Sequence, residues 1–250
     1  MRILSNLKLI PFVLLAALSS SGATFFAVGD FSTVNGNPNG VWTYGAAADN
    51  HSNMSVVFTL HDETASFAEW TNGNPFFFPG DYPLIGHNVT NAPLPDASSV
   101  YQPTELRLSA NDPGNVADPI VVVRFTAPSA GFYQFAGSFQ AEDNGSIGPG
   151  THSEATINAN NLAPLLTLEI NGSNGSVDTH PFSFGLSLNG GNTVDFRVNA
   201  CQAGGTCHFF SDGTGLTLAV TQGVVGGVPE PGSLLLAAGS LLALWALRFR

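Results

Sequence analysis

The feature that most limits the fold is the absence of any sustained helical period between residues 24 and 225. Short runs rich in β-branched and aromatic residues recur there, separated by clusters of Gly, Pro, Asn and Ser, which is typical of strands joined by turns. The runs cover residues 41–44, 55–60, 66–70, 84–90, 104–109, 120–126, 131–139, 165–170, 181–188, 193–198 and 215–221. Short strands in this number, without helices, predict an all-β fold: a single β-sandwich or jelly-roll-like domain over residues 24–221.

Alternation inside these runs predicts which side chains face the core. Leu106 and Leu108 share one face of their strand. Within 193–198, the apolar residues point inward while Asp195 and Arg197 point outward, because successive strand residues face opposite sides. The aromatic residues of 132–135 fall on both faces, which predicts a central strand buried on both sides.

Charge excludes one class of partner. The formal net charge is −11, although only 10% of the residues are charged. The one lysine is Lys8, and Arg107, Arg124 and Arg197 are the only arginines between the two ends. A domain so acidic and so poor in fixed positive charge repels phosphate backbones, which argues against nucleic-acid binding.

Residues 1–23 are predicted to be a signal peptide. Arg2 and Lys8 give a positive start, residues 9–18 form an apolar run, and small residues follow. We expect cleavage between Ala23 and Thr24. The alternative is an N-terminal membrane anchor, for which the apolar run is short.

The C-terminal segment has three parts in order. Residues 222–228 form a Gly-rich flexible linker, and residues 229–250 begin with Pro229-Glu230-Pro231. An apolar stretch at 233–247 predicts a transmembrane helix, and Arg248 and Arg250 would stay on the cytoplasmic side. The alternative is an ordinary single-pass anchor that is never processed.

This arrangement resembles the PEP-CTERM sorting signal of Gram-negative bacteria. The resemblance implies that an exosortase, a membrane cysteine transpeptidase, recognises Pro229-Glu230-Pro231 and removes the tail. It also implies an exported protein that is transiently anchored in the inner membrane and then resides in the cell envelope, at the cell surface or in the extracellular matrix. The two prolines keep this segment extended, and an extended segment can enter a protease cleft.

A second resemblance covers most of the exported region. Residues 37–45, 121–133, 189–196 and 212–216 resemble, in this order, secreted bacterial β-sandwich domains similar in shape to carbohydrate-binding modules. This resemblance implies a fold more than a ligand. The chain departs from the pattern at residues 145–162, an insertion where a short loop is expected.

Two cysteines, Cys201 and Cys207, are predicted to form a disulfide, because export leads to an oxidising compartment. The alternative is a pair of free thiols. A metal site is a poorer interpretation, since His208 is the only nearby third ligand.

Metal and cofactor candidates are few. His61, Asp62 and Glu63 are consecutive, so strand geometry keeps them from converging, and we interpret them as solvated residues. Acidic residues in turns are candidates for a structural Ca²⁺ ion, or are plain acidic turns. They are Glu142, Asp143, Asp195 and Asp212. No other cofactor is expected.

Aromatic residues are the candidates for sugar stacking. Trp42, Tyr44 and Trp70 would stack on a sugar if exposed, whereas the competing interpretation places them in the core. Residues 76–78, three consecutive phenylalanines, are candidates for an adhesive patch.

These features predict a non-enzymatic surface or matrix protein that is processed at its Pro-Glu-Pro signal. The alternative is a carbohydrate-binding, lectin-like adhesin that contacts extracellular polysaccharide. A secreted hydrolase is a third interpretation, which lacks a nucleophile or metal motif in the sequence.

Overall fold

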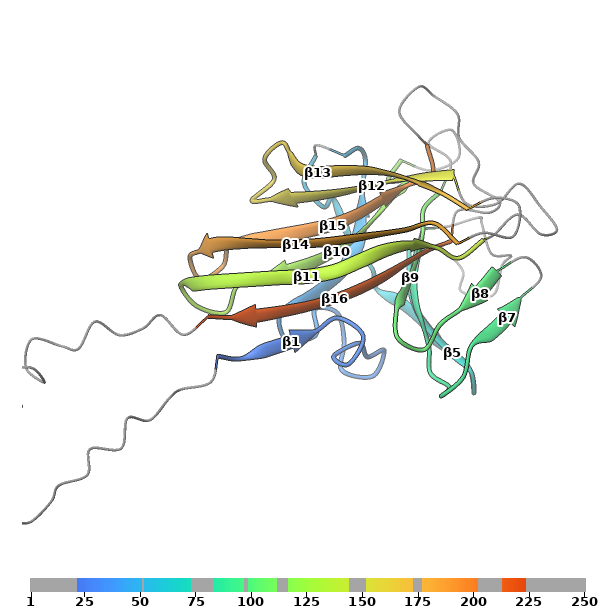
Figure 1. Ribbon diagram of the computed structural model, residues 1–250. Coiled ribbons are helices and arrows are strands. Elements are labelled where there is room, and N and C mark those ends of the chain that lie inside the picture. Colours follow the sequence, from blue (N-terminus) through green and yellow to red (C-terminus); the bar gives the residue numbers. More distant parts are fainter. Residues whose placement is uncertain are drawn as a thin grey trace, which may run out of the picture.

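The computed structural model describes residues 22–50, 52–72, 83–96, 99–111, 117–143, 152–172, 177–201 and 213–223. Every regular element within these residues is a β-strand, and the strands form two large sheets and one separate hairpin (Figure 1). All their pairings are antiparallel. The predicted all-β class is confirmed, and the arrangement is that of a sandwich.

The first sheet, called sheet A, contains the long strands at the front of Figure 1. Its order is β14 (Thr179–Leu188), β11 (Gly131–Ala141), β16 (Thr214–Gln222), β9 (Leu106–Ser109), β6 (Leu84–Asn88), β5 (Phe67–Thr71) and β4 (Leu60–Glu63). Strand β1 (Thr24–Phe26) pairs with the last residues of β16, whereas β9 pairs with its first residues.

The second sheet, called sheet B, lies behind the first. Its order is β13 (Pro164–Asn171), β12 (His152–Ala159), β15 (Thr193–Asn199), β10 (Ile120–Thr126), β2 (Trp42–Ala47) and β3 (Val56–Val57). The hairpin of β7 (Leu94–Asp96) and β8 (Ser99–Tyr101) stands apart from both sheets and contacts the end of β11, where Val100 N donates to Glu142 O at 3.2 Å.

An aromatic cluster joins the two sheets. The ring of Phe125 on β10 lies 5.6 Å from that of Tyr133 and 5.5 Å from that of Phe135, both on β11. The ring of Phe196 on β15 lies 5.6 Å from that of Phe182 on β14. These pairs bury the inward faces of both sheets in one core, which is the main source of stability for a sandwich.

The predicted strands are confirmed where their apolar pattern is strong. Residues 120–126 form β10 with the predicted bounds, and Leu106 and Leu108 are both fully buried in the core. No strand was predicted in the insertion at residues 145–162, yet residues 152–159 form β12, which lies between β13 and β15. The inward residues of β12 are mostly small, so they carry little apolar signal.

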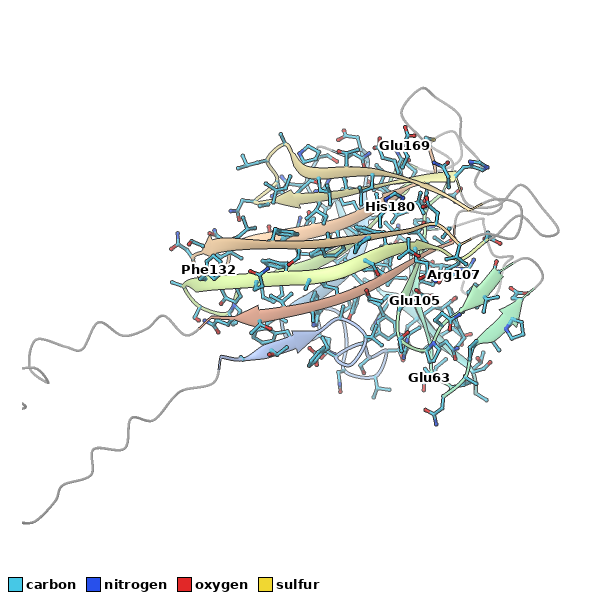
Figure 2. The ribbon with its side chains drawn as sticks, viewed as in Figure 1. Glu63, Glu105, Arg107, Phe132, Glu169 and His180 are labelled. Atoms are coloured by element: carbon cyan, nitrogen blue, oxygen red, sulfur yellow. The ribbon has the colours of Figure 1, made fainter. Side chains whose placement is uncertain are left out.

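The prediction that β11 is buried on both sides is also wrong. Tyr133 and Phe135 point into the core, but Phe132 points outward and is 48% exposed (Figure 2). The outer face of β11 is open because neither large sheet covers it. The ring of Phe132 instead lies over Gly185 of the neighbouring strand, where a Cβ atom would come within 2.2 Å of it.

Both ends of the described domain lie at one corner of the sandwich. Thr24 is opposite Thr221 in the pairing of β1 with β16, and Gln222 N donates to Ala23 O at 2.8 Å. Figure 1 shows the start of β1 beside the end of β16. The predicted cleavage between Ala23 and Thr24 would therefore leave all of β1 in place.

Other sequence predictions fall outside the described residues. They concern the signal peptide, the linker from residue 224 onward, the Pro229-Glu230-Pro231 signal, the helix at 233–247, and Arg248 and Arg250. Cys207 also lies outside, so its disulfide with Cys201 stays a prediction. Among the residues that are described, no helix is long and apolar enough to span a membrane.

Candidate functional site

The three residues predicted as candidates for sugar stacking are core residues. Trp42 and Tyr44 are fully buried and Trp70 is 3% exposed. The indole N–H groups of both tryptophans make hydrogen bonds within the fold. Trp42 Nε1 donates to Asp30 Oδ2 at 3.0 Å, and Trp70 Nε1 donates to Ser32 O at 2.9 Å. The stacking role is therefore wrong for all three, because a sugar cannot reach a ring face that the two sheets already cover.

The burial of Trp42 nonetheless positions a pocket. The segment between β1 and β2 folds back over Trp42 and lines a pocket of about 440 Å³ that is open to solvent. We call it the Asp30 pocket. Its lining combines polar and aromatic groups: Phe25, Gly29, Asp30, Phe31, Ser32, Asn35, Asn39, Gly40, Val41 and Trp42. Its volume falls within the range of small-ligand sites in proteins.

Asparagine side chains fix the segment that forms this pocket. Asn37 Nδ2 donates to Tyr44 O and Phe58 O, and its Oδ1 accepts from Tyr44 N at 2.9 Å. Asn39 exchanges two backbone hydrogen bonds with Trp42, and its Nδ2 donates to Asp30 O. Gly40 has a φ of +59°, a conformation that glycine adopts without the steric cost of a side chain.

Asp30 is the charged group of the pocket. Its Oδ2 accepts from Phe26 N and from Trp42 Nε1, each at 3.0 Å. No hydrogen bond within the described residues uses Asp30 Oδ1, Asn39 Oδ1 or the side-chain amide of Asn35. The carboxylate is therefore held in place by Oδ2, and Oδ1 has no hydrogen-bond partner among the described residues.

A second polar assembly, the Arg107 cluster, lies at the other end of sheet A beneath β8. The guanidinium of Arg107 lies 4.3 Å from the centre of the Tyr101 ring, and its Nε lies 3.7 Å from Glu142 Oε2. Figure 2 shows Arg107 beside Glu105. Both carboxylate oxygens of Glu142 are buried and have no hydrogen-bond partner in the described structure. A buried ion pair whose carboxylate oxygens lack hydrogen bonds is weak evidence for stability.

Gly215 on β16 and Gly213 just before this strand make room for the Arg107 cluster. A Cβ atom on Gly215 would lie 2.3 Å from Glu105 Oε2, and one on Gly213 would lie 2.6 Å from Glu142 Oε2. The carboxylates thus pack directly on the sheet backbone, away from water. Burial raises the pKa of Glu105 to about 7, and burial likewise raises the pKa of Glu142 well above its usual value.

This burial predicts a stability that falls as pH rises. The folded pKa of Glu105, about 7, lies above an unfolded value of about 4.3, so the folded state binds more protons between these limits. We expect the free energy of unfolding to decrease by up to about 3 kcal/mol from pH 5 to pH 8 through Glu105. Urea titrations at both pH values measure it.

Two variants control this prediction. Glu105→Gln stays neutral at both pH values and should flatten the profile, whereas Glu169→Gln on exposed β13 should leave it unchanged. Equal stability of the unaltered protein at pH 5 and pH 8 would contradict the prediction.

The third polar assembly lies on sheet B. Asp195 accepts from Arg124 Nε at 2.7 Å and Arg124 Nη2 at 2.9 Å, and from Arg197 Nη2 at 2.7 Å. Both Asp195 and Arg197 point outward as predicted, yet they are buried, because the segment after β2 covers them. Arg197 Nη1 donates to Asp49 O at 3.2 Å, and Asn158 Nδ2 donates to Asn50 O at 3.0 Å.

The candidate Ca²⁺ ligands are not brought together. Asp195 lies on sheet B between two guanidinium groups, whereas Glu142 and Asp143 follow β11 of sheet A. Asp143 accepts from Ser99 Oγ, and Asp212 lies outside the described residues. The described part of the chain holds no group of three or more His, Cys, Asp or Glu side chains that fits a metal ion. His61, Asp62 and Glu63 form most of β4 and do not converge.

No protein-family model matches this chain. No curated protein matches it either. Among solved structures, a family 35 carbohydrate-binding module from Clostridium thermocellum is 14% identical, with a TM-score of 0.27 over 62% of this chain and 88% of that one. Rabbit GITRL is 13% identical, with a TM-score of 0.27 over 49% of this chain and 88% of that one. Likenesses this weak do not identify a function.

Sequence reasoning did not single out Asp30, Asn35 or Asn39 as a site. Their only local signal is a turn-rich stretch, residues 29–40, between two aromatic positions. Such stretches also form ordinary loops, so the sequence alone gives no reason to choose this one.

Proposed function

We propose that this protein is an exported, non-enzymatic component of the cell surface or extracellular matrix, processed at Pro229-Glu230-Pro231. The supporting observation is that β1 starts and β16 ends at the same corner of the sandwich, with Thr24 opposite Thr221. A leader and a tail attached there reach the same membrane without crossing the domain. Cleavage of both would remove neither strand.

The charge of the domain also suits an exported protein better than a protein that acts on nucleic acid. Arg107 is 9% exposed and Arg197 is fully buried, and Arg124 is paired with Asp195. Within the described residues, therefore, no guanidinium is left free at the surface. A surface dominated by carboxylates and neutral polar groups keeps a secreted protein soluble and repels polyanions.

A non-catalytic role is proposed because two of the buried carboxylates oppose arginines within the fold. Asp195 binds two arginines, and Glu142 faces Arg107 beneath the β7–β8 hairpin. Each of these carboxylates opposes a fixed cation within the fold.

Mass spectrometry of the mature C-terminus tests the processing. In cells that contain an exosortase, we expect peptides ending near residue 229 and none that cover residues 234–250. In cells without the enzyme, or with Pro229, Glu230 and Pro231 all replaced by alanine, the tail should remain. Replacing Gly226 and Gly227 by alanine is the matched control and should still allow processing. Peptides from 234–250 on the mature surface protein would refute the proposal.

A second candidate function is glycan binding, which the Asp30 pocket favours. Asp30, Asn35 and Asn39 offer hydrogen-bonding groups next to the half-buried rings of Phe25 and Phe31. Sugars need both kinds of contact, since their hydroxyl groups bond to amides and carboxylates while their C–H faces pack on aromatic rings. In this proposal the protein holds matrix polysaccharide at the surface.

A further inference from the structure

The chemistry of the Asp30 pocket specifies its ligand more closely than glycan binding in general. We infer that the pocket takes an uncharged sugar residue, held by hydroxyl donation to Asp30 and Asn39, and rejects uronic acids and other anionic sugars. This inference rests on the second proposed function, glycan binding.

The pocket offers acceptor oxygens and a smaller set of neutral donors. Asp30 Oδ1 and Asn39 Oδ1 are acceptors that no described hydrogen bond uses, and Ser32 Oγ already accepts from Val34 N at 3.2 Å and Asn35 N at 3.1 Å. The Ser32 hydroxyl can still donate, and the side-chain amide of Asn35 can both donate and accept. Sugar hydroxyls match this mixture, because each hydroxyl can donate to Asp30 and Asn39 and can accept from Ser32 or Asn35.

Electrostatics exclude an anion. No lysine or arginine lines the pocket, and the carboxylate of Asp30 is exposed to it. The three arginines of the domain are engaged elsewhere, with Glu142 or Asp195. A uronate carboxylate would approach Asp30 with no cation to offset the repulsion, so discrimination arises from an unfavourable contact as well as from a favourable one.

The polar groups are preorganised. Trp42 Nε1 and Phe26 N fix Asp30 Oδ2, and the two backbone bonds between Asn39 and Trp42 fix the far wall. Because Trp42 is fully buried, these bonds tie the pocket to the rigid core. Little conformational entropy is then lost when a ligand binds.

Two aromatic rings provide the apolar wall. Phe25 packs on Phe125 with ring centres 5.6 Å apart, and Phe31 packs on Tyr44 at 5.1 Å. Both phenylalanines are only partly buried, unlike Trp42, Tyr44 and Trp70. The aromatic contact that the sequence assigned to tryptophan thus falls to phenylalanines that it did not single out.

Two other cavities in the described part of the chain lack this combination. A groove of about 440 Å³ between β13 and β14 is lined mainly by apolar residues, among them Leu165, Phe182 and Leu186. A third cavity of about 480 Å³ lies between Phe26, Pro103 and Leu218. Neither lining contains a carboxylate or an amide side chain, so neither offers comparable acceptors for hydroxyl groups.

Calorimetric titration of the full-length protein tests the inference. The probes are neutral gluco-, manno- and xylo-oligosaccharides and, as the anionic comparison, an oligogalacturonide. We expect at least one neutral probe to bind and the oligogalacturonide to bind at least tenfold more weakly. Asp30→Asn and Asn35→Ala should each weaken neutral binding about tenfold or more, whereas Glu169→Gln on β13 should not change it.

The Asn35→Ala variant separates binding from folding, because no described hydrogen bond involves the Asn35 side chain, and its melting temperature should match that of the unaltered protein. Neutral binding that survives both pocket substitutions would overturn this inference while leaving glycan binding in place. Equal or tighter binding of the oligogalacturonide would also overturn it. If none of the neutral probes binds, the second proposed function itself fails.

Discussion

Replacing Asp195 by asparagine is expected to lower the free energy of unfolding by about 3 to 5 kcal/mol, the range for breaking one partner of a buried ion pair. Asp195 is 1% exposed and neutralises two guanidinium groups, of which that of Arg197 is fully buried. Without the carboxylate, both positive charges remain in a poorly hydrated site. Urea unfolding followed by tryptophan fluorescence measures the loss.

The same site offers an informative companion variant. Replacing Asp195 and Arg197 together, by leucine and methionine, removes the carboxylate and the fully buried guanidinium, and leaves only Arg124, whose side chain is 18% exposed, without its partner. The double variant should therefore cost less than Asp195→Asn alone. Glu169→Gln, an exposed change on β13, is the control and should stay within about 0.5 kcal/mol. A loss below about 1 kcal/mol for Asp195→Asn would show that water reaches the site.

Replacing Phe125 by alanine is expected to lower the free energy of unfolding by about 3 to 5 kcal/mol, as is usual for deleting a buried aromatic ring. Four rings surround Phe125: Phe25 at 5.6 Å, Trp42 at 5.4 Å, Tyr133 at 5.6 Å and Phe135 at 5.5 Å. Its removal opens a cavity where the two sheets meet, and neighbours fixed on strands relax only partly.

Phe125→Leu should lose less, since leucine refills part of the volume. Leu162→Ala is the matched surface control, because Leu162 is 66% exposed, and it should be nearly neutral. Comparable losses for Phe125→Ala and Leu162→Ala in the same urea titration would contradict the packing described here.

Local patterns predict the strands where inward residues are large and apolar. Residues 120–126 contain consecutive β-branched residues, and they form β10 with the predicted bounds. Strand β12 has inward residues such as Ser153, Ala155 and Ala159, which are too small to give an apolar signal. It forms a strand because β13 and β15 pair with it on its two sides. The local sequence of a segment does not show which other strands will pair with it.

The candidate site shows the same limit. The sequence left two interpretations of Trp42, sugar stacking or core packing. A sequence gives the identity of a side chain but not which other residues pack over it. The structure buries Trp42 and uses its indole N–H to orient Asp30, 12 residues earlier. The pocket arises from a loop that folds back on the core, so contacts rather than periodicity define it.

By itself, the sequence determined the all-β class, the inward positions of Leu106 and Leu108, and the scarcity of basic residues, because alternation and composition are properties of neighbouring residues or of the whole chain. The tertiary structure alone decided which outward residues meet water. Asp195 and Arg197 face away from the core as expected, yet a loop more than a hundred residues earlier covers them. The burial of an outward-facing side chain depends on contacts with residues distant in the sequence, which no local pattern records.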